Sequence, residues 1–245
     1  MTAKLYYGSV TASSYTSTSA ASGYPASNAG LPAVRRPWRS TSSSSNDLQM
    51  NFTLRSIVAM LLHDINLSAG TVSYINSVNS AVSLGSQSSQ VDQVGRRRML
   101  LASGPSAQGW KMAFSGSPTD GAAYWSAGSM YAFTNSLTLP VDPLVGARVR
   151  YVRPRIQNEL PNGQLTDAKT GPEYAEITMR FRGLRSADLQ QLERLADAGV
   201  CCLDLGDSLA PWNVWPVRCA MKTIDRAMSR ATQDEVELIC REVVA

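Results

Sequence analysis

The sequence predicts a mainly β protein, in which a β-sandwich over residues 1–140 precedes a smaller β-rich domain over residues 141–245. Apolar positions spaced two apart recur along the chain, which is the period of a strand with one buried face. Ser and Thr are abundant, whereas charged residues make up 17% of the chain, below the quarter that is typical of globular domains. A helical period is found in one segment, at about 186–198, so we expect one α-helix in the second domain.

Two apolar runs define the front of the sandwich. In the run from Leu48 to Phe52, apolar side chains alternate with polar ones, so one face of a strand would cover a core. The run from Ile57 to Leu62 is apolar at every position, as expected of a strand that is buried on both faces. It ends at residues 63–66 (His-Asp-Ile-Asn), where we predict a turn. Residues 71–75 alternate again and should form the next strand.

Two polar segments lie around these strands. Residues 9–22, mostly small or hydroxyl-bearing, fit either an extended N-terminal arm on a neighbouring molecule or a poorly packed lead into the first strand. Residues 76–93 are rich in Ser and are predicted to form a long loop.

The net charge of +4 and the pI near 9.0 are too small a basic excess to indicate nucleic-acid binding by themselves. Three adjacent arginines at 96–98 could meet phosphate, an acidic partner or only water, and a solvated strand entry is the simplest interpretation. No run of about 18 apolar residues indicates a membrane span, and residues 1–7 lack the apolar stretch of a secretory signal. We therefore expect the protein to fold in the cytosol, with reduced cysteines.

The second domain begins with two alternating strands around a polar loop. Residues 145–151 alternate apolar side chains with arginines, which predicts a strand with a basic outer face. Residues 174–182 alternate in the same way. The loop between them, at 158–171, carries Asn162-Gly163, a strong turn pair. The two strands are therefore expected to form a hairpin.

The predicted helix follows this hairpin. Ser186 is placed to cap it, Asp188 lies in the first turn, where the helix dipole favours a carboxylate, and Gly199 ends it. Its apolar stripe consists of Leu189, Leu192, Leu195 and Ala196. Further strands are expected over residues 200–205, 212–218 and 236–244.

Several short motifs follow one another in the first 135 residues: Tyr-Pro-Ala-Ser-Asn (24–28), Trp-Arg-Ser (38–40), His-Asp-Ile-Asn-Leu-Ser (63–68), Trp-Lys-Met-Ala-Phe (110–114) and the segment 124–133. In this order they resemble the discoidin-like jelly-roll module of tailed-phage tail proteins and, more distantly, the galactose-binding-like sandwiches of secreted proteins. The second half, with its strand, short helix and terminal strand, resembles the ring-forming core of phage distal-tail and baseplate proteins.

These resemblances imply a non-enzymatic structural component of a phage tail, at the baseplate or the distal end, that forms a ring oligomer and connects neighbouring tail proteins. Such a protein would be made in the host cytoplasm and located in the virion. The alternative is a carbohydrate-binding module for host-surface glycans, and a head-to-tail connector or nozzle component is a weaker one. The sequence contains no glycine-rich phosphate loop, paired catalytic carboxylates or histidine cluster, so we predict no catalytic residue and no cofactor.

The four cysteines form the metal-site candidate of the sequence: Cys201, Cys202, Cys219 and Cys240. Some phage tail-tip proteins hold an iron–sulfur cluster through four cysteines. Adjacent residues on a strand point to opposite faces, however, and no Cys-x-x-Cys pair is present. We therefore predict small, buried, apolar cysteines in preference to a metal site.

His63, the single histidine, lies beside Asp64 at the predicted end of a buried strand. Neighbours on a strand diverge, and no nucleophile motif accompanies this pair. We therefore expect the histidine to hydrogen-bond to a loop and to have no catalytic role.

The candidates for glycan or partner contact are aromatic residues near predicted loop ends: Tyr24, Tyr124, Trp125, Trp212 and Trp215. The first three could form a platform on which a sugar ring stacks. Trp212 and Trp215, each beside a proline, could be buried against a neighbouring subunit. Trp38 has two interpretations, a core plug as in the discoidin-like family or a part of the platform, and we favour the core.

Overall fold

The structure, a computed structural model, describes residues 3–30, 37–92, 95–102, 104–139, 147–159, 165–182, 186–206, 214–225 and 235–243. These residues form an 11-stranded sheet, a five-stranded sheet and a separate two-stranded sheet, together with one α-helix. The predicted mainly β fold class is confirmed. Within the described ranges, no helix has the length and apolar character needed to cross a membrane.

The first half contains β1 (Lys4–Ser9), β2 (Ser14–Ser17), the 3₁₀-helix η1 (Ala26–Gly30), β3 (Trp38–Arg39), β4 (Asn46–Ser56), β5 (Ala59–Ile65), β6 (Ala69–Ile75), β7 (Ala81–Ser88), β8 (Gln90–Val91), β9 (Arg97–Leu101), β10 (Ser106–Phe114) and β11 (Ser126–Thr138). The second half contains β12 (Arg148–Val152), β13 (Arg155–Glu159), β14 (Leu165–Lys169), β15 (Tyr174–Arg182), α1 (Ser186–Ala196), β16 (Cys201–Asp204), β17 (Val214–Asp225) and β18 (Glu235–Glu242).

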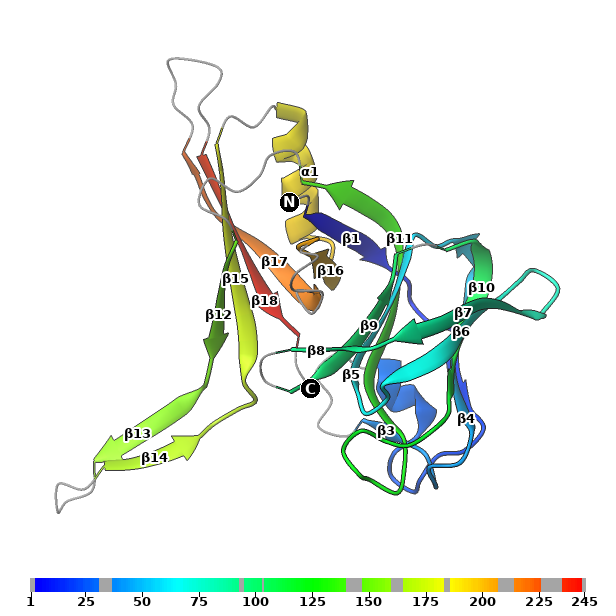
Figure 1. Cartoon of the computed structure of the whole chain (residues 1–245). Helices are drawn as coiled ribbons and strands as arrows, with labels where there is room; N and C mark the ends of the chain where they lie inside the picture. The colour runs from blue at the N-terminus through cyan, green and yellow to red at the C-terminus, as the bar shows by residue number, and fades with distance from the viewer. Residues whose placement is uncertain are drawn as a thin grey trace.

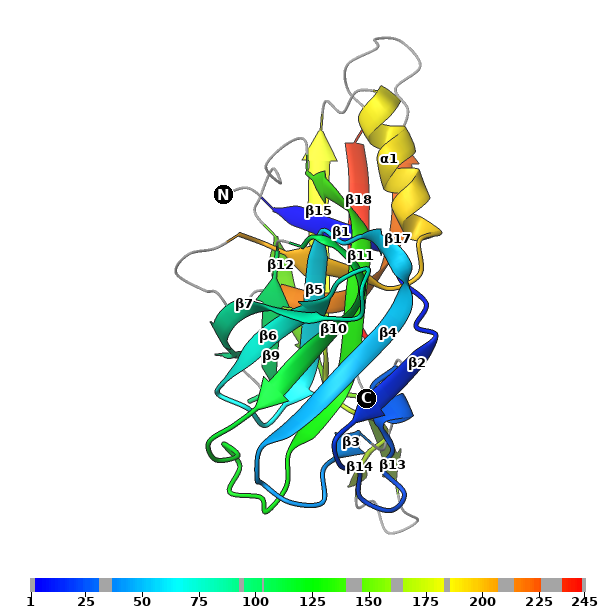
Figure 2. The ribbon, with the colours of Figure 1, turned by 90° about the vertical axis from the view of Figure 1, so that its right-hand side faces the viewer.

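The first half is a jelly-roll β-sandwich, seen on the right of Figure 1 and facing the viewer in Figure 2. The five-stranded sheet, in the order β2-β4-β10-β6-β7, packs against β3, β11, β5 and β9 of the large sheet. β4 shows the predicted alternation, since Leu48, Met50 and Phe52 are buried between polar neighbours. These side chains meet those of β5 and β11 in one hydrophobic core, which fastens the two layers together.

Three aromatic rings pack in series inside the sandwich. The centroid of the Phe114 ring lies 5.2 Å from that of Trp38 and 5.8 Å from that of Trp125. Both indole rings are fully buried. The core interpretation of Trp38 is therefore confirmed.

β5 is buried on both faces, as predicted. Met60 and Leu62 point into the sandwich core, whereas Ala59 and Leu61 belong to a second apolar cluster that also contains residues of the second half. The predicted end of this strand at His63 is wrong, because the ladders continue: His63 pairs with Arg98 of β9, and Ile65 pairs with Ala127 of β11. The strand is covered on its outer face because the second half packs there.

The N-terminal segment is not an arm. β1 pairs with β11 on one side and with β16 on the other, so it joins the two halves into one continuous sheet. Leu5 and Tyr6 of this strand are buried. Within residues 9–22, β2 pairs with β4, and Val10 is part of the sandwich core. Both interpretations of residues 9–22 are therefore wrong, since neither local alternation nor charge revealed these distant pairings.

The long loop predicted at residues 76–93 is also wrong. β7 pairs with β6 along its length, and β8 pairs with β9. The side chain of Asn76 closes the tight turn before β7, because its Oδ1 accepts hydrogen bonds from the backbone N–H groups of Val78 (3.0 Å) and Ser80 (2.9 Å). β7 is an exposed edge strand, so its sequence lacks the apolar face on which a strand prediction depends.

In the second half the sheet continues in the order β16-β17-β18-β15-β12. β15 has the predicted bounds and its predicted apolar face is buried, and its pairing with β12 confirms the predicted hairpin. Helix α1 packs on this sheet through Leu192 and Leu195 (Figure 1). Gly199 follows the helix with φ of +73°, a conformation that glycine adopts without strain. The division at residue 140 stays a prediction.

The polar loop predicted at residues 158–171 is largely a β-ribbon. β13 and β14 pair with each other in their own two-stranded sheet, and Figure 1 shows that this hairpin projects away from the rest of the molecule. Asn162-Gly163 lies outside the described residues. The two strand sequences, Arg-Ile-Gln-Asn-Glu and Leu-Thr-Asp-Ala-Lys, lack the apolar alternation on which a strand prediction depends. We call β13 and β14 the projecting hairpin.

Candidate functional site

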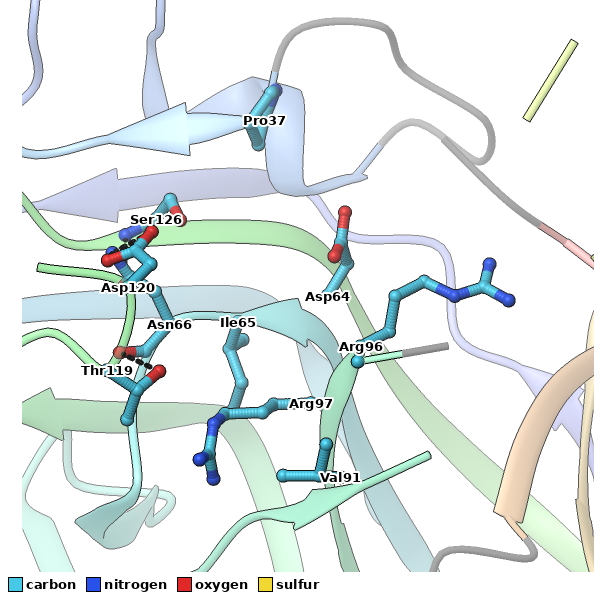
Figure 3. A pocket seen from close by; sticks show the side chains of 11 residues that line it. Pro37, Asp64, Ile65, Asn66, Val91, Arg96, Arg97, Thr119, Asp120 and Ser126 are labelled. Carbon is cyan, nitrogen blue, oxygen red and sulfur yellow. Dashed lines mark hydrogen bonds between the residues drawn. The ribbon is translucent and has the colours of Figure 1, made fainter. Parts of the chain in front are cut away.

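A polar pocket of about 330 Å³ lies at one end of the jelly roll (Figure 3). The end of β5, the start of β9, the start of β11 and the loop that precedes β11 form its walls. Its lining residues are Pro37, Asp64, Ile65, Asn66, Val91, Gly95, Arg96, Arg97, Thr119, Asp120 and Ser126. Small-molecule sites in proteins commonly begin at about 300 Å³, so the pocket has the size of a ligand site.

Asp64 is the exceptional residue of this polar pocket. Its φ is +56°, in the left-handed region that non-glycine residues rarely adopt and that Asp and Asn tolerate best. Gly128 lies opposite on β11, and a Cβ there would come within 2.8 Å of the Asp64 Cβ. Figure 3 shows the Asp64 carboxylate directed into the open space of the pocket. Among the described residues it has no hydrogen-bond or ion-pair partner, so the backbone presents an unpaired carboxylate to solvent or ligand.

Asn66 holds in place the loop before β11, which forms one wall of the pocket. Its Nδ2 donates to the Asp120 carboxylate (3.1 Å to Oδ1) and to the backbone oxygen of Tyr124 (2.9 Å). Its Oδ1 accepts from the backbone N–H of Ser126 at 2.8 Å, and its backbone oxygen accepts from the N–H of Thr119 at 2.8 Å. Because Asn66 is buried and satisfied on all sides, it fixes the position of the Asp120 carboxylate before any ligand arrives.

The pocket also contains two arginines with different surroundings. Arg97 Nη1 donates to Ser89 Oγ at 3.3 Å, and within the described ranges its other guanidinium donors have no partner. Arg96 Nη2 donates to Glu242 Oε2 at 2.8 Å. Its side chain points away from Asn66 and Asp120 (Figure 3). The pocket therefore offers acceptors on Asp64 and Asp120 and donors on Arg97.

Beside the pocket, two of the predicted contact residues meet around an arginine. The Arg39 Cζ lies 4.2 Å from the centroid of the Tyr24 ring and 4.9 Å from that of Tyr124. All three side chains are half-buried at the surface. Tyr24 and Tyr124 are thus brought together as expected, but a cation, which the sequence did not indicate, lies against both rings.

Two of the remaining aromatic candidates, Trp125 and Trp215, are not surface contacts. Trp125 and Trp215 are both fully buried, so neither ring can stack on a sugar or on a neighbouring subunit, and these two predictions are wrong. Trp125 immediately precedes β11 and lies in the sandwich core together with Ala127, whereas Ser126 between them lines the pocket. Trp212 lies outside the described residues.

A buried ion cluster joins the two halves behind the pocket, and it consists of His63, Asp92, Arg96, Arg98 and Glu242. His63 Nε2 donates to Glu242 Oε1 at 3.3 Å, and the backbone N–H of Ala175 donates to Glu242 Oε2 at 2.8 Å. Arg98 forms an ion pair with Asp92 and donates to the backbone oxygen of Val214.

Two predictions are corrected by this buried ion cluster. His63 bonds to the C-terminal strand and not to a loop. Arg98 is buried rather than solvated, because its position on β9 directs it between the two halves, where its Cζ lies 5.5 Å from the Trp215 ring centroid. Burial acts to raise the pKa of Glu242, but the hydrogen bond and charge of His63, with the charges of Arg96 and Arg98, outweigh it and lower this pKa.

The cysteines divide between two faces, as predicted from their spacing. Cys201, Cys219 and Cys240 lie in the core beneath α1, whereas Cys202 lies in the other apolar cluster. All four are buried and free, which confirms the predicted burial. The sulfurs of Cys219 and Cys240 are 3.1 Å apart. A hydrogen bond with Cys219 and burial raise the pKa of Cys201, which favours its neutral thiol. No group of three or more metal-ligating side chains is found in the described part of the chain.

No protein-family model and no curated protein matches this sequence significantly. Solved structures that match include the family 32 carbohydrate-binding module of C. perfringens NanJ in complex with galactose, with 13% identity, a TM-score of 0.41, and coverage of 49% of this chain and 92% of that one. A family 32 module of a Clostridium perfringens family 31 glycoside hydrolase has 11% identity, a TM-score of 0.43 and coverage of 52% and 96%. A Streptococcus pneumoniae fucose-binding module has 10% identity, a TM-score of 0.39 and coverage of 53% and 98%.

Proposed function

We propose that the protein is a non-catalytic carbohydrate-binding protein that holds its ligand in the polar pocket. The Asp64 carboxylate, which has no partner among the described residues, carries this proposal, since strained backbone positions cluster at functional sites. Hydroxyl groups of a sugar donate to carboxylates and accept from guanidinium and amide N–H groups. The pocket offers both kinds of partner within one small volume. Host-surface glycans are the ligands that the sequence resemblance suggests.

The pocket chemistry fits a polyol better than an apolar ligand. Most of its lining side chains are polar, and the Asp120 carboxylate is pre-positioned by Asn66. Pre-positioned groups lose less conformational entropy when a ligand binds. Each sugar hydroxyl that displaces water from Asp64 or Asp120 forms a charge-assisted hydrogen bond, which is stronger than a neutral one.

Replacing Asp64 with Asn tests the proposed function. We expect about a tenfold loss of affinity, equivalent to about 1.4 kcal/mol, for any oligosaccharide that binds the wild-type protein. Asn tolerates the left-handed conformation, so the fold should be retained. The measurement is a screen on a printed array of neutral and acidic oligosaccharides, followed by calorimetric titration of the strongest binder.

The matched control is Asp167→Asn, because Asp167 is a carboxylate on the projecting hairpin, far along the chain from the pocket. This variant should bind as the wild type does. The proposal fails if the array shows no binder, or if Asp64→Asn and Asp167→Asn bind the same oligosaccharide equally well.

A second candidate is a structural component of a phage tail that assembles into a ring. The same ring could serve as a head-to-tail connector or nozzle component. The projecting hairpin supports it. An isolated two-stranded ribbon is only marginally stable in water, and Ile156 on this ribbon is 52% exposed. Insertion of the hairpin into a neighbouring copy would cover Ile156 and add main-chain pairs. Such a head-to-tail contact closes into a ring when the rotation between copies allows it.

Ile156→Asp tests this second candidate. We expect the wild-type protein to sediment as an oligomer and Ile156→Asp to shift it to monomer, since a charge would have to be buried in the contact. Leu54→Asp is the matched control, because Leu54 is also 52% exposed but lies on β4 of the sandwich. A wild-type protein that stays monomeric across the concentration range in analytical ultracentrifugation would contradict this candidate.

A further inference from the structure

The guanidinium of Arg39 is a surface cation without an acidic partner among the residues that the structure describes. The Tyr24 and Tyr124 rings lie 4.2 Å and 4.9 Å from its Cζ, respectively. Its Nε is buried and makes no hydrogen bond in the described ranges. A buried donor without a partner costs free energy, so the site would gain from an anionic or strongly accepting group.

Backbone contacts hold this arginine in place from both sides. The Arg39 N–H donates to the Tyr24 oxygen at 3.3 Å, and the Arg39 oxygen accepts from the Ala21 N–H at 2.8 Å. On the other side Arg39 pairs with Ser126 of β11, two residues after Tyr124. The two rings and the arginine are therefore fixed by three chain segments before any ligand binds.

The arginine adjoins the polar pocket. Ser126 lines that pocket and is the cross-strand partner of Arg39, so the two side chains lie on the same face of the sheet. Asn66, also in the lining, donates to the Tyr124 backbone oxygen at 2.9 Å. A ligand seated in the pocket would thus extend along one wall to Arg39.

We propose that Arg39 binds the carboxylate of an acidic sugar residue, in a ligand whose hydroxyl groups occupy the polar pocket; this rests on the proposed function and specifies its ligand class. Aromatic rings contact the faces of a guanidinium and leave its N–H edge free. That edge matches the two oxygens of a carboxylate, which it binds through paired hydrogen bonds. Asp64 and Asp120 repel a carboxylate and offset the charge of Arg97 in the same lining, so the charge of the ligand is directed to Arg39 and its hydroxyls to the pocket.

A pair of matched probes tests this assignment on the full chain. Trigalacturonic acid carries free carboxylates, and its methyl ester keeps the same rings without the charge. We expect the wild-type protein to bind the acid at least about tenfold more tightly than the ester. Arg39→Gln should remove this difference while retaining the affinity for the ester. Arg55→Gln, which removes the same charge from an exposed position on β4, should keep the preference.

Each result of the titrations separates this assignment from the proposed function. Equal binding of acid and ester, or a preference that survives in Arg39→Gln, overturns the acidic-sugar assignment and leaves carbohydrate binding standing. Binding of inorganic phosphate as tightly as the acid would show a general anion site and also overturns it. Absence of binding to either probe, together with an array without binders, overturns both proposals. If Arg39→Gln does not fold, Arg39→Lys should reduce the preference by about threefold, because an ammonium lacks the paired geometry.

Discussion

Glu242→Gln should lower the free energy of unfolding by about 3–5 kcal/mol, the cost of removing one partner from a buried ion pair. Glu242 accepts from His63, Arg96 and the backbone N–H of Ala175. The substitution keeps the size of the side chain, but it removes the charge and replaces one accepting carboxylate oxygen with an amide group that donates. Arg98 would then remain buried between the two halves with less negative charge nearby to balance its own. The measurement is chemical denaturation at pH 7 for the wild type and the variant.

Arg241→Ala is the control, because Arg241 precedes Glu242 on β18 but forms an exposed pair with Glu176. Its cost should stay below about 1 kcal/mol. Since the pKa of Glu242 is lowered by folding, its contribution is fully present above the unfolded pKa of about 4.3 and is lost as the pH falls through the folded value. The difference between wild type and Glu242→Gln should therefore shrink in acid. A difference that stays constant from neutral to acidic pH contradicts this role.

Trp125→Ala should lower the free energy of unfolding by about 3–5 kcal/mol, as expected when a large aromatic side chain is removed from a core. The ring of Trp125 packs against Phe114, and its Nε1 donates to the Ser44 backbone oxygen at 2.8 Å. The neighbouring Tyr124 provides the contrast. Tyr124→Ala removes a half-exposed ring and one cation–π contact, which should cost about 1 kcal/mol or less.

Thermal and chemical denaturation of the two variants distinguish a core position from a ligand platform. If Trp125 were a platform, Trp125→Ala would unfold as the wild type does and lose ligand affinity. The structure predicts the opposite assignment, with the stability change at Trp125 and the binding change at Tyr124. A Trp125→Ala variant of wild-type stability would contradict the packing described for the sandwich.

Much of the fold could be predicted because it depends on local patterns. The alternation in Leu48 to Phe52 reappears as the buried face of β4, and the strand predicted at 174–182 has the bounds of β15. Cys201 and Cys202 fall on opposite faces, as adjacent residues on a strand must. These features were predictable since one buried face imposes its period on the sequence.

The candidate site could be predicted only in part. Tyr24 and Tyr124 were identified as aromatics near loop ends, but Arg39 between them has no sequence signal. The unusual backbone of Asp64 depends on the absence of a side chain at Gly128, a residue of another strand. The tract His-Asp-Ile-Asn at 63–66 singled out this region of the sequence. Only the structure, in which β5 pairs with β11, showed that Asp64, Ile65 and Asn66 line a pocket.

By itself the sequence determined a mainly β chain with one helix, a sandwich core that contains Trp38, and buried cysteines on two faces. Only the tertiary structure decided that β1 joins the two halves, that His63 meets Glu242 across 179 residues, and that the Asp64 carboxylate lines a polar pocket. The physical reason is the range of the interactions. Burial of one face acts between neighbours along a strand and leaves a period in the sequence, whereas ion pairs and strand order join distant segments and leave none.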